Sequence, residues 1–84
     1  MHMNCQIMGL RVDHRRVNAP NLQKALTANG HDIKMRIGLH QPGEAGHGDD
    51  GVILLQVSGG PGTANGLLQE LNGISGVKAQ LMEL

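Results

Sequence analysis

Apolar residues follow two different patterns along this chain, and the order in which the patterns alternate restricts the fold more than any other feature. Four segments show the alternation or the short apolar run that is typical of strands, and two show the one-face spacing of a helix. The strand segments are residues 5–12, 33–39, 52–57 and 77–81, and the helical segments are residues 18–28 and 64–72. Asn18 is the expected cap of the first helix, with Pro20 in its first turn, and Gly73 ends the second.

The order strand, helix, strand, strand, helix, strand predicts an α+β fold, the ferredoxin-like βαββαβ sandwich. In that plan a four-stranded antiparallel sheet carries two helices on one face, and the first and third strands are central. Both of these strands have apolar residues on their two faces, as at Ile7 and Val52, whereas the other two alternate cleanly like edge strands. A chain of 84 residues has room for one such domain, residues 1–84.

The alternation also predicts which side chains cover each face of the sheet. The face beneath the helices is expected to receive Met8, Leu10, Val12, Ile33, Met35, Ile37, Ile53, Leu55, Val57, Val77, Ala79 and Leu81. The opposite face is expected to hold Ile7, Gly9, Val52 and Leu54, flanked by Lys34, Arg36, Lys78 and Gln80. Soluble monomers seldom expose such an apolar strip, so we expect a homo-oligomer, a dimer or tetramer, with an interface that includes the first four of these residues. Either the sheet faces stack or the sheet edges join.

The composition argues against several classes of function. The chain has no Phe, Tyr or Trp, and aromatic rings line most sites for flat cofactors and stack single-stranded bases, so we expect no cofactor. Seven basic and seven acidic residues balance, which leaves no field that would steer the chain to nucleic acid or to anionic membranes. One cysteine, no secretory signal and no long apolar run predict a cytoplasmic protein.

The segment between the second and third strands, residues 40–51, concentrates side chains that can bind metals. His40 and His47 are the candidate ligands, and Glu44, Asp49 and Asp50 lie near them in sequence. The spacing matches no metal motif, and an exposed hairpin tip is the simpler interpretation.

A second set of metal ligands would combine Cys5 with His14. A lone cysteine at the start of a strand is more often a small buried or terminal residue. Catalysis is not expected either, because no nucleophile–base pair can be located, and the adjacent Asp49 and Asp50 would point to opposite sides of an extended strand.

A glycine-rich turn joins the third strand to the second helix, where backbone N–H groups can hold an anion. The ligand-binding candidates here are Gly59, Gly60, Gly62 and Thr63. Neither GxGxxG nor GxxxxGK[ST] is present, and a tight turn needs glycine for conformational reasons alone. On the predicted outer face, Lys34, Arg36 and Lys78 either bind a carboxylate or form a solvated charged surface.

Two short stretches carry a resemblance to a known family. They are Met-Arg-Ile-Gly at residues 35–38 and Leu-Asn-Gly-Ile-Ser-Gly-Val-Lys at residues 71–78, with the apolar strand 52–57 between them. In these stretches the chain resembles the iron-only hydrogenase system regulators, small ACT-like proteins related in fold to the C-terminal domain of nickel-responsive repressors. The resemblance implies an oligomeric regulator, and ACT domains commonly bind small metabolites such as amino acids at subunit interfaces. No DNA-binding element precedes the domain, so direct DNA contact is not expected.

Together these observations predict a homo-oligomeric regulatory or ligand-binding module and not an enzyme. A metal-sensing domain with His and Cys ligands is the alternative, and a small enzyme is a more distant one. The expected partners are a second copy of the chain and a small metabolite such as an amino acid, without direct nucleic-acid or membrane binding.

Overall fold

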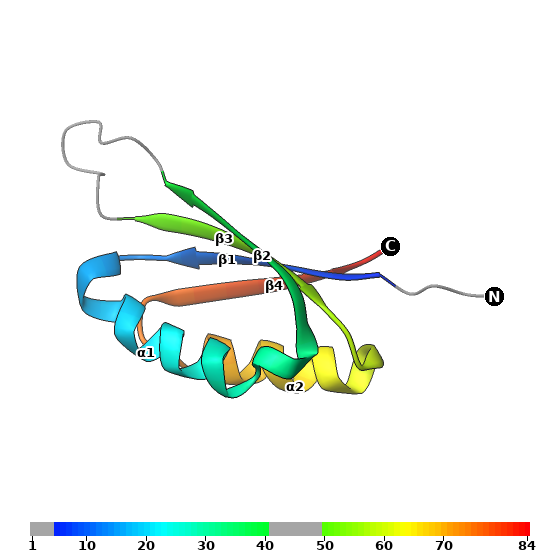
Figure 1. The fold of residues 1–84 in the computed structure, drawn as a ribbon. Helices are drawn as coiled ribbons and strands as arrows, with labels where there is room; N and C mark the ends of the chain where they lie inside the picture. The colour runs from blue at the N-terminus through cyan, green and yellow to red at the C-terminus, as the bar shows by residue number, and fades with distance from the viewer. Residues whose placement is uncertain (1–4, 41–49) are drawn as a thin grey trace.

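Figure 1 shows the computed structural model of the chain, which describes residues 5–40 and 50–84. The elements are β1 (Gln6–Val12), α1 (Arg15–Ala28), the 3-10 helix η1 (Gly30–Asp32), β2 (Ile33–His40), β3 (Gly51–Val57), α2 (Gly60–Asn72) and β4 (Val77–Glu83). The four strands form one antiparallel sheet in the order β2-β3-β1-β4, and both helices lie on the same side of it (Figure 1). The predicted ferredoxin-like α+β fold is confirmed, with the first and third strands in the centre.

The alternation along β1 divides the sheet into a buried and an open face. Met8, Leu10 and Val12 are at most 1 % exposed and face the helices, whereas the residues between them lie on the other face. The helices cover the first face with apolar residues at helical spacing: Leu22 and Leu26 from α1, and Ala64, Leu67 and Leu71 from α2. In the described part of the chain, neither helix is long and apolar enough to cross a lipid bilayer.

The second strand contains a β-bulge that its sequence pattern does not reveal. Ile33 pairs with Val57, but the next residue of β3, Gln56, pairs with Met35. Lys34 is therefore an extra residue on β2. A bulge of this kind moves every later side chain of the strand to the opposite face of the sheet.

This shift makes three of the predicted side-chain placements wrong. Met35 and Ile37 were expected beneath the helices, but they lie on the open face and are 41 % and 42 % exposed. Arg36 was expected on the open face, but it lies on the helix side, where its Nη2 donates a 2.6 Å hydrogen bond to Oε1 of Gln23 in α1. The side chains of β2 do alternate, but the bulge moves those after Lys34 to the face opposite the predicted one.

The first helix begins earlier than predicted. His14, with a left-handed φ of 49°, precedes the first helical residue, Arg15, so Pro20 lies inside the helix and not in its first turn. The backbone N–H of Asn18 already donates to the carbonyl of His14, so Asn18 is not the cap. Its side-chain amide donates to the carbonyl of Asp13, which ties the start of α1 to the end of β1.

Candidate functional site

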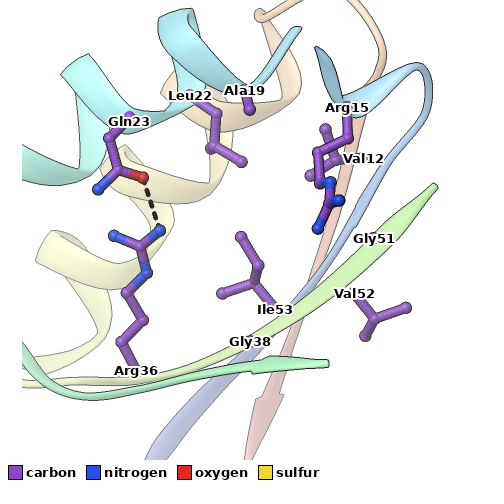
Figure 2. Close-up of a pocket in the computed structure, with 10 residues that line it drawn as sticks. All are labelled: Val12, Arg15, Ala19, Leu22, Gln23, Arg36, Gly38, Gly51, Val52 and Ile53. Atoms are coloured by element: carbon purple, nitrogen blue, oxygen red, sulfur yellow. Dashed lines mark hydrogen bonds between the residues drawn. The ribbon is translucent and has the colours of Figure 1, made fainter. Parts of the chain in front are cut away.

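A cavity of about 490 Å³ lies between α1 and the β2–β3 hairpin (Figure 2). This volume is within the range of about 300–1,000 Å³ that is usual for small-molecule sites. Residues from four elements line it: Val12 of β1, Arg15, Ala19, Leu22 and Gln23 of α1, Arg36 and Gly38 of β2, and Gly51, Val52 and Ile53 of β3. The cavity therefore brings together segments that are far apart in the sequence.

The inner wall of the cavity is apolar. Val12 and Leu22 are 1 % and 2 % exposed, and the side chain of Ile53 points from β3 toward the helices (Figure 2). Gly38 keeps the wall open, because a Cβ built at this position would meet no heavy atom within 4 Å. Val52 lies at the rim, since its side chain points to the other side of β3 (Figure 2). An aliphatic group of a ligand would find contacts here.

The charged residues of the described lining are Arg15 and Arg36. The bulge in β2 brings Arg36 to this side of the sheet, where it bonds to Gln23. The side chain of Arg15 passes over Gly51, because a Cβ on this glycine would lie 3.2 Å from Cδ of the arginine. Figure 2 shows the two guanidinium groups on either side of Ile53. Both groups are therefore part of the wall that a ligand would meet.

Two acidic side chains near the start of α1 are engaged outside the lining. Oδ1 of Asp13 lies 3.1 Å from Nε of Arg11, and Oδ2 of Asp50 lies 3.6 Å from Nη2 of the same arginine. Oδ1 of Asp50 also accepts a 3.3 Å hydrogen bond from the backbone N–H of His14. These carboxylates therefore associate with the β1–α1 turn.

The described lining is suited to binding an anion. A guanidinium stays protonated in proteins and presents a planar fork of N–H donors that matches a carboxylate or a phosphate. Among the described lining residues there is no Ser, Thr, Cys, His, Asp, Glu, Lys or Tyr.

The candidate metal ligands of the β2–β3 segment fall mostly outside the described residues. This applies to His47, Glu44 and Asp49. His40 is described by its backbone, which pairs with Gly51 at the end of β2. In the described ranges, no group of three or more His, Cys, Asp and Glu side chains is arranged to hold a metal ion.

Cys5 and His14 do not form a ligand pair. They lie at opposite ends of β1, which separates them by its full length. Sγ of Cys5 instead accepts a 3.5 Å hydrogen bond from Nε2 of Gln56. The strand predicted over residues 5–12 already separates the two positions.

The glycine-rich turn forms the start of α2, as expected. Gly59 and Gly60 have φ values of 92° and 85°, which glycine adopts at little cost and other residues rarely adopt. Thr63 packs over this turn, since a Cβ on Gly59 would lie 2.9 Å from its Oγ1. Gly62 lies within the helix, and a Cβ there would meet nothing within 4 Å. The turn conformation explains the first two glycines, and ligand binding by these four residues stays a prediction.

Local sequence patterns do not mark Arg15, Gln23 and Gly38 as site residues. A weak signal was present in β2, where Arg36 and Gly38 interrupt apolar residues and share one face of the strand. That pattern predicts open space next to a charged side chain, but it does not indicate on which face of the sheet the two lie.

Comparison with known proteins supports the fold. No family model matches the chain, and no curated protein matches it. Among solved structures, the uncharacterized protein TM1266 from Thermotoga maritima is similar, with a TM-score of 0.80 and 22 % sequence identity over 98 % of this chain and 99 % of that one. A likeness at this level of identity shows a shared fold. The resemblance to hydrogenase system regulators stays a prediction.

Proposed function

We propose that this domain is a non-enzymatic regulatory module that binds a small carboxylate with an aliphatic body, such as an amino acid or the corresponding keto acid. The observation that carries the proposal is the pair of guanidinium groups, Arg15 and Arg36, in the lining of an otherwise largely apolar cavity of about 490 Å³. A carboxylate is a stronger acceptor than the amide oxygen of Gln23 that Arg36 contacts in this structure. The aliphatic group would pack against Leu22 and Ile53.

Binding, and not catalysis, is the activity that this lining supports. A general acid or base must exchange a proton near neutral pH, and the arginines of the cavity do not. A ligand at this position would contact α1 and the β2–β3 hairpin together. It would stabilise the conformation in which these elements are close, which is how a small molecule shifts a population of states.

Thermal unfolding with a matched set of small molecules tests the proposal. L-leucine and 4-methyl-2-oxopentanoate carry a carboxylate, and L-leucinamide keeps the aliphatic body without it. At a ligand concentration of about ten times Kd, the free energy of unfolding rises by about 1.4 kcal/mol, which moves the thermal midpoint of a domain of this size by about 6–11 °C. We expect a carboxylate to raise the midpoint and the amide to leave it unchanged. An equal response to the amide, or no response to any carboxylate of this size, would contradict the proposal.

Variants locate the ligand. Gly38→Leu places a side chain in the open space of the cavity and is expected to remove the ligand response while the domain stays folded. Arg36→Gln removes one cation and is expected to weaken the response. Lys78→Gln is the matched control, because Lys78 is exposed on β4 and is not part of the lining. A ligand response that survives Gly38→Leu would place the binding site elsewhere.

A further inference from the structure

The sheet face opposite the helices, which we call the open face, is apolar over most of its area. Its apolar side chains are Ile7, Met35, Ile37, Val52, Leu54 and Met82. Three of these are among the most exposed large apolar residues described: Met35 at 41 %, Ile37 at 42 % and Met82 at 52 %. The bulge in β2 adds two of them to the strip that the sequence predicts. We infer that a second copy of this chain covers the open face, with the two sheets stacked face to face.

Both edges of the sheet are poorly suited to joining a second sheet side by side. At the β4 edge, the side-chain amide of Asn72 donates to the carbonyl of Ala79 at 3.1 Å and accepts from its N–H at 2.7 Å. These are backbone groups that an added strand would need. At the β2 edge, the extra residue Lys34 interrupts the ladder, and bulges and lysines at edges discourage pairing. The open face is therefore the surface for association.

The charges of the open face favour an identical partner. Arg11 and Lys78 are paired across β1 and β4 at one end of the face, where Arg11 contacts the carboxylates of both Asp13 and Asp50. The rest of the face carries no charged side chain among the described residues. A nucleic acid or an acidic peptide would need a broader cationic surface. A two-fold stack with reversed strands places apolar residues on apolar residues and leaves the charged end of each face at the rim of the contact.

The size of the open face indicates how strong the association of two copies can be. Strands of seven residues, spaced about 4.8 Å apart with a rise of about 3.3 Å per residue, give a four-stranded face of about 19 by 23 Å. The projected area is therefore about 440 Å², below the roughly 800 Å² per partner of a standard interface. A contact of this size suits a weak, reversible dimer. Met35 and Met82 can adapt their shape to the opposing surface.

A hollow in the open face offers a place for a side chain of the second copy. It has a volume of about 300 Å³ and lies over Gly9, between Val52 on one side and Lys78 and Gln80 on the other. A Cβ added to Gly9 would contact Cδ2 of Leu54 at 3.8 Å, an ordinary van der Waals distance. A Cβ at position 9 is therefore compatible with the folded chain and would project into the hollow.

Sedimentation equilibrium tests the inference directly. We expect the apparent mass of the wild-type chain to approach twice its 8.9 kDa as the concentration rises, with a Kd below about 100 µM. Ile37→Lys places a charge among the apolar residues of the open face, on the edge strand β2, and is expected to raise Kd by at least about tenfold. Val17→Lys is the matched control, because Val17 is 74 % exposed on α1, and it is expected to leave Kd unchanged. Circular dichroism establishes that each variant is folded.

Gly9→Val separates an effect on association from an effect on folding. Valine suits a strand better than glycine, so we expect the thermal midpoint of the monomer, measured at low concentration, to be kept or raised. Association is expected to weaken, because valine takes up space on the floor of the hollow that a side chain of the second copy would occupy. A wild-type chain that stays at 8.9 kDa at about 100 µM would overturn the inference. So would a dimer that tolerates both Ile37→Lys and Gly9→Val, or one that Val17→Lys disrupts.

Discussion

Gln6, the first residue of β1, is a polar residue that is buried with the aliphatic core. It is 1 % exposed, on the buried face of β1, and neither Oε1 nor Nε2 has a hydrogen-bond partner among the described residues. A buried amide group without partners costs about 1–3 kcal/mol of stability. We therefore expect Gln6→Leu, which keeps a similar volume, to raise the free energy of unfolding by about 1–3 kcal/mol in chemical denaturation.

Gln69→Leu is the control, because it makes the same replacement of Gln by Leu at a position that is exposed on α2. Its effect is expected to stay within about 0.5 kcal/mol. A loss of stability in Gln6→Leu would mean that the amide finds a partner in solution, such as a buried water, and that the group contributes to the fold.

The glycines at the start of α2 are not equivalent, although they are close in sequence. Gly60 has a positive φ of 85°, whereas Gly62 lies in the helix with open space around its Cβ position. Alanine is better than glycine in a helix by up to about 1 kcal/mol, so Gly62→Ala is expected to raise the free energy of unfolding by about 0.5–1 kcal/mol. Gly60→Ala forces alanine into a left-handed conformation and is expected to lower it by about 1 kcal/mol or more. Denaturant titration of both variants measures the difference, and equal effects would contradict this account of the turn.

The sheet separates the two surfaces to which we assign binding. The cavity lies between α1 and the β2–β3 hairpin on the helix side, and the hollow over Gly9 lies on the open face. Substitutions at sites without shared partners usually have additive effects. We expect Gly38→Leu to leave the dimer Kd unchanged and Ile37→Lys to leave the ligand-induced rise in thermal midpoint intact. A ligand response that disappears in Ile37→Lys would show that the cavity needs the dimer.

Local patterns were sufficient to predict the order of the elements and most of the core. The spacing of Ala64, Leu67 and Leu71 places them on one face of a helix, wherever that helix lies in the fold. All three residues are buried in α2. The apolar residues on both faces of β1 and β3 predicted that these strands are central, and they are. Such inferences succeed because the periods of helices and strands are properties of the backbone and do not depend on distant contacts.

Tertiary structure decided where the faces of β2 point and hence where both candidate sites lie. Alternation is the same on either side of a bulge, so the pattern from Ile33 to Ile37 cannot show that Lys34 is an extra residue. That information is in the pairing of β2 with β3, which joins residues distant in the chain. Because of this one register shift, Arg36 faces the cavity beside α1, and Met35 and Ile37 extend the open face. A single-residue change in pairing is thus invisible to local periodicity and yet sets the chemistry of both surfaces.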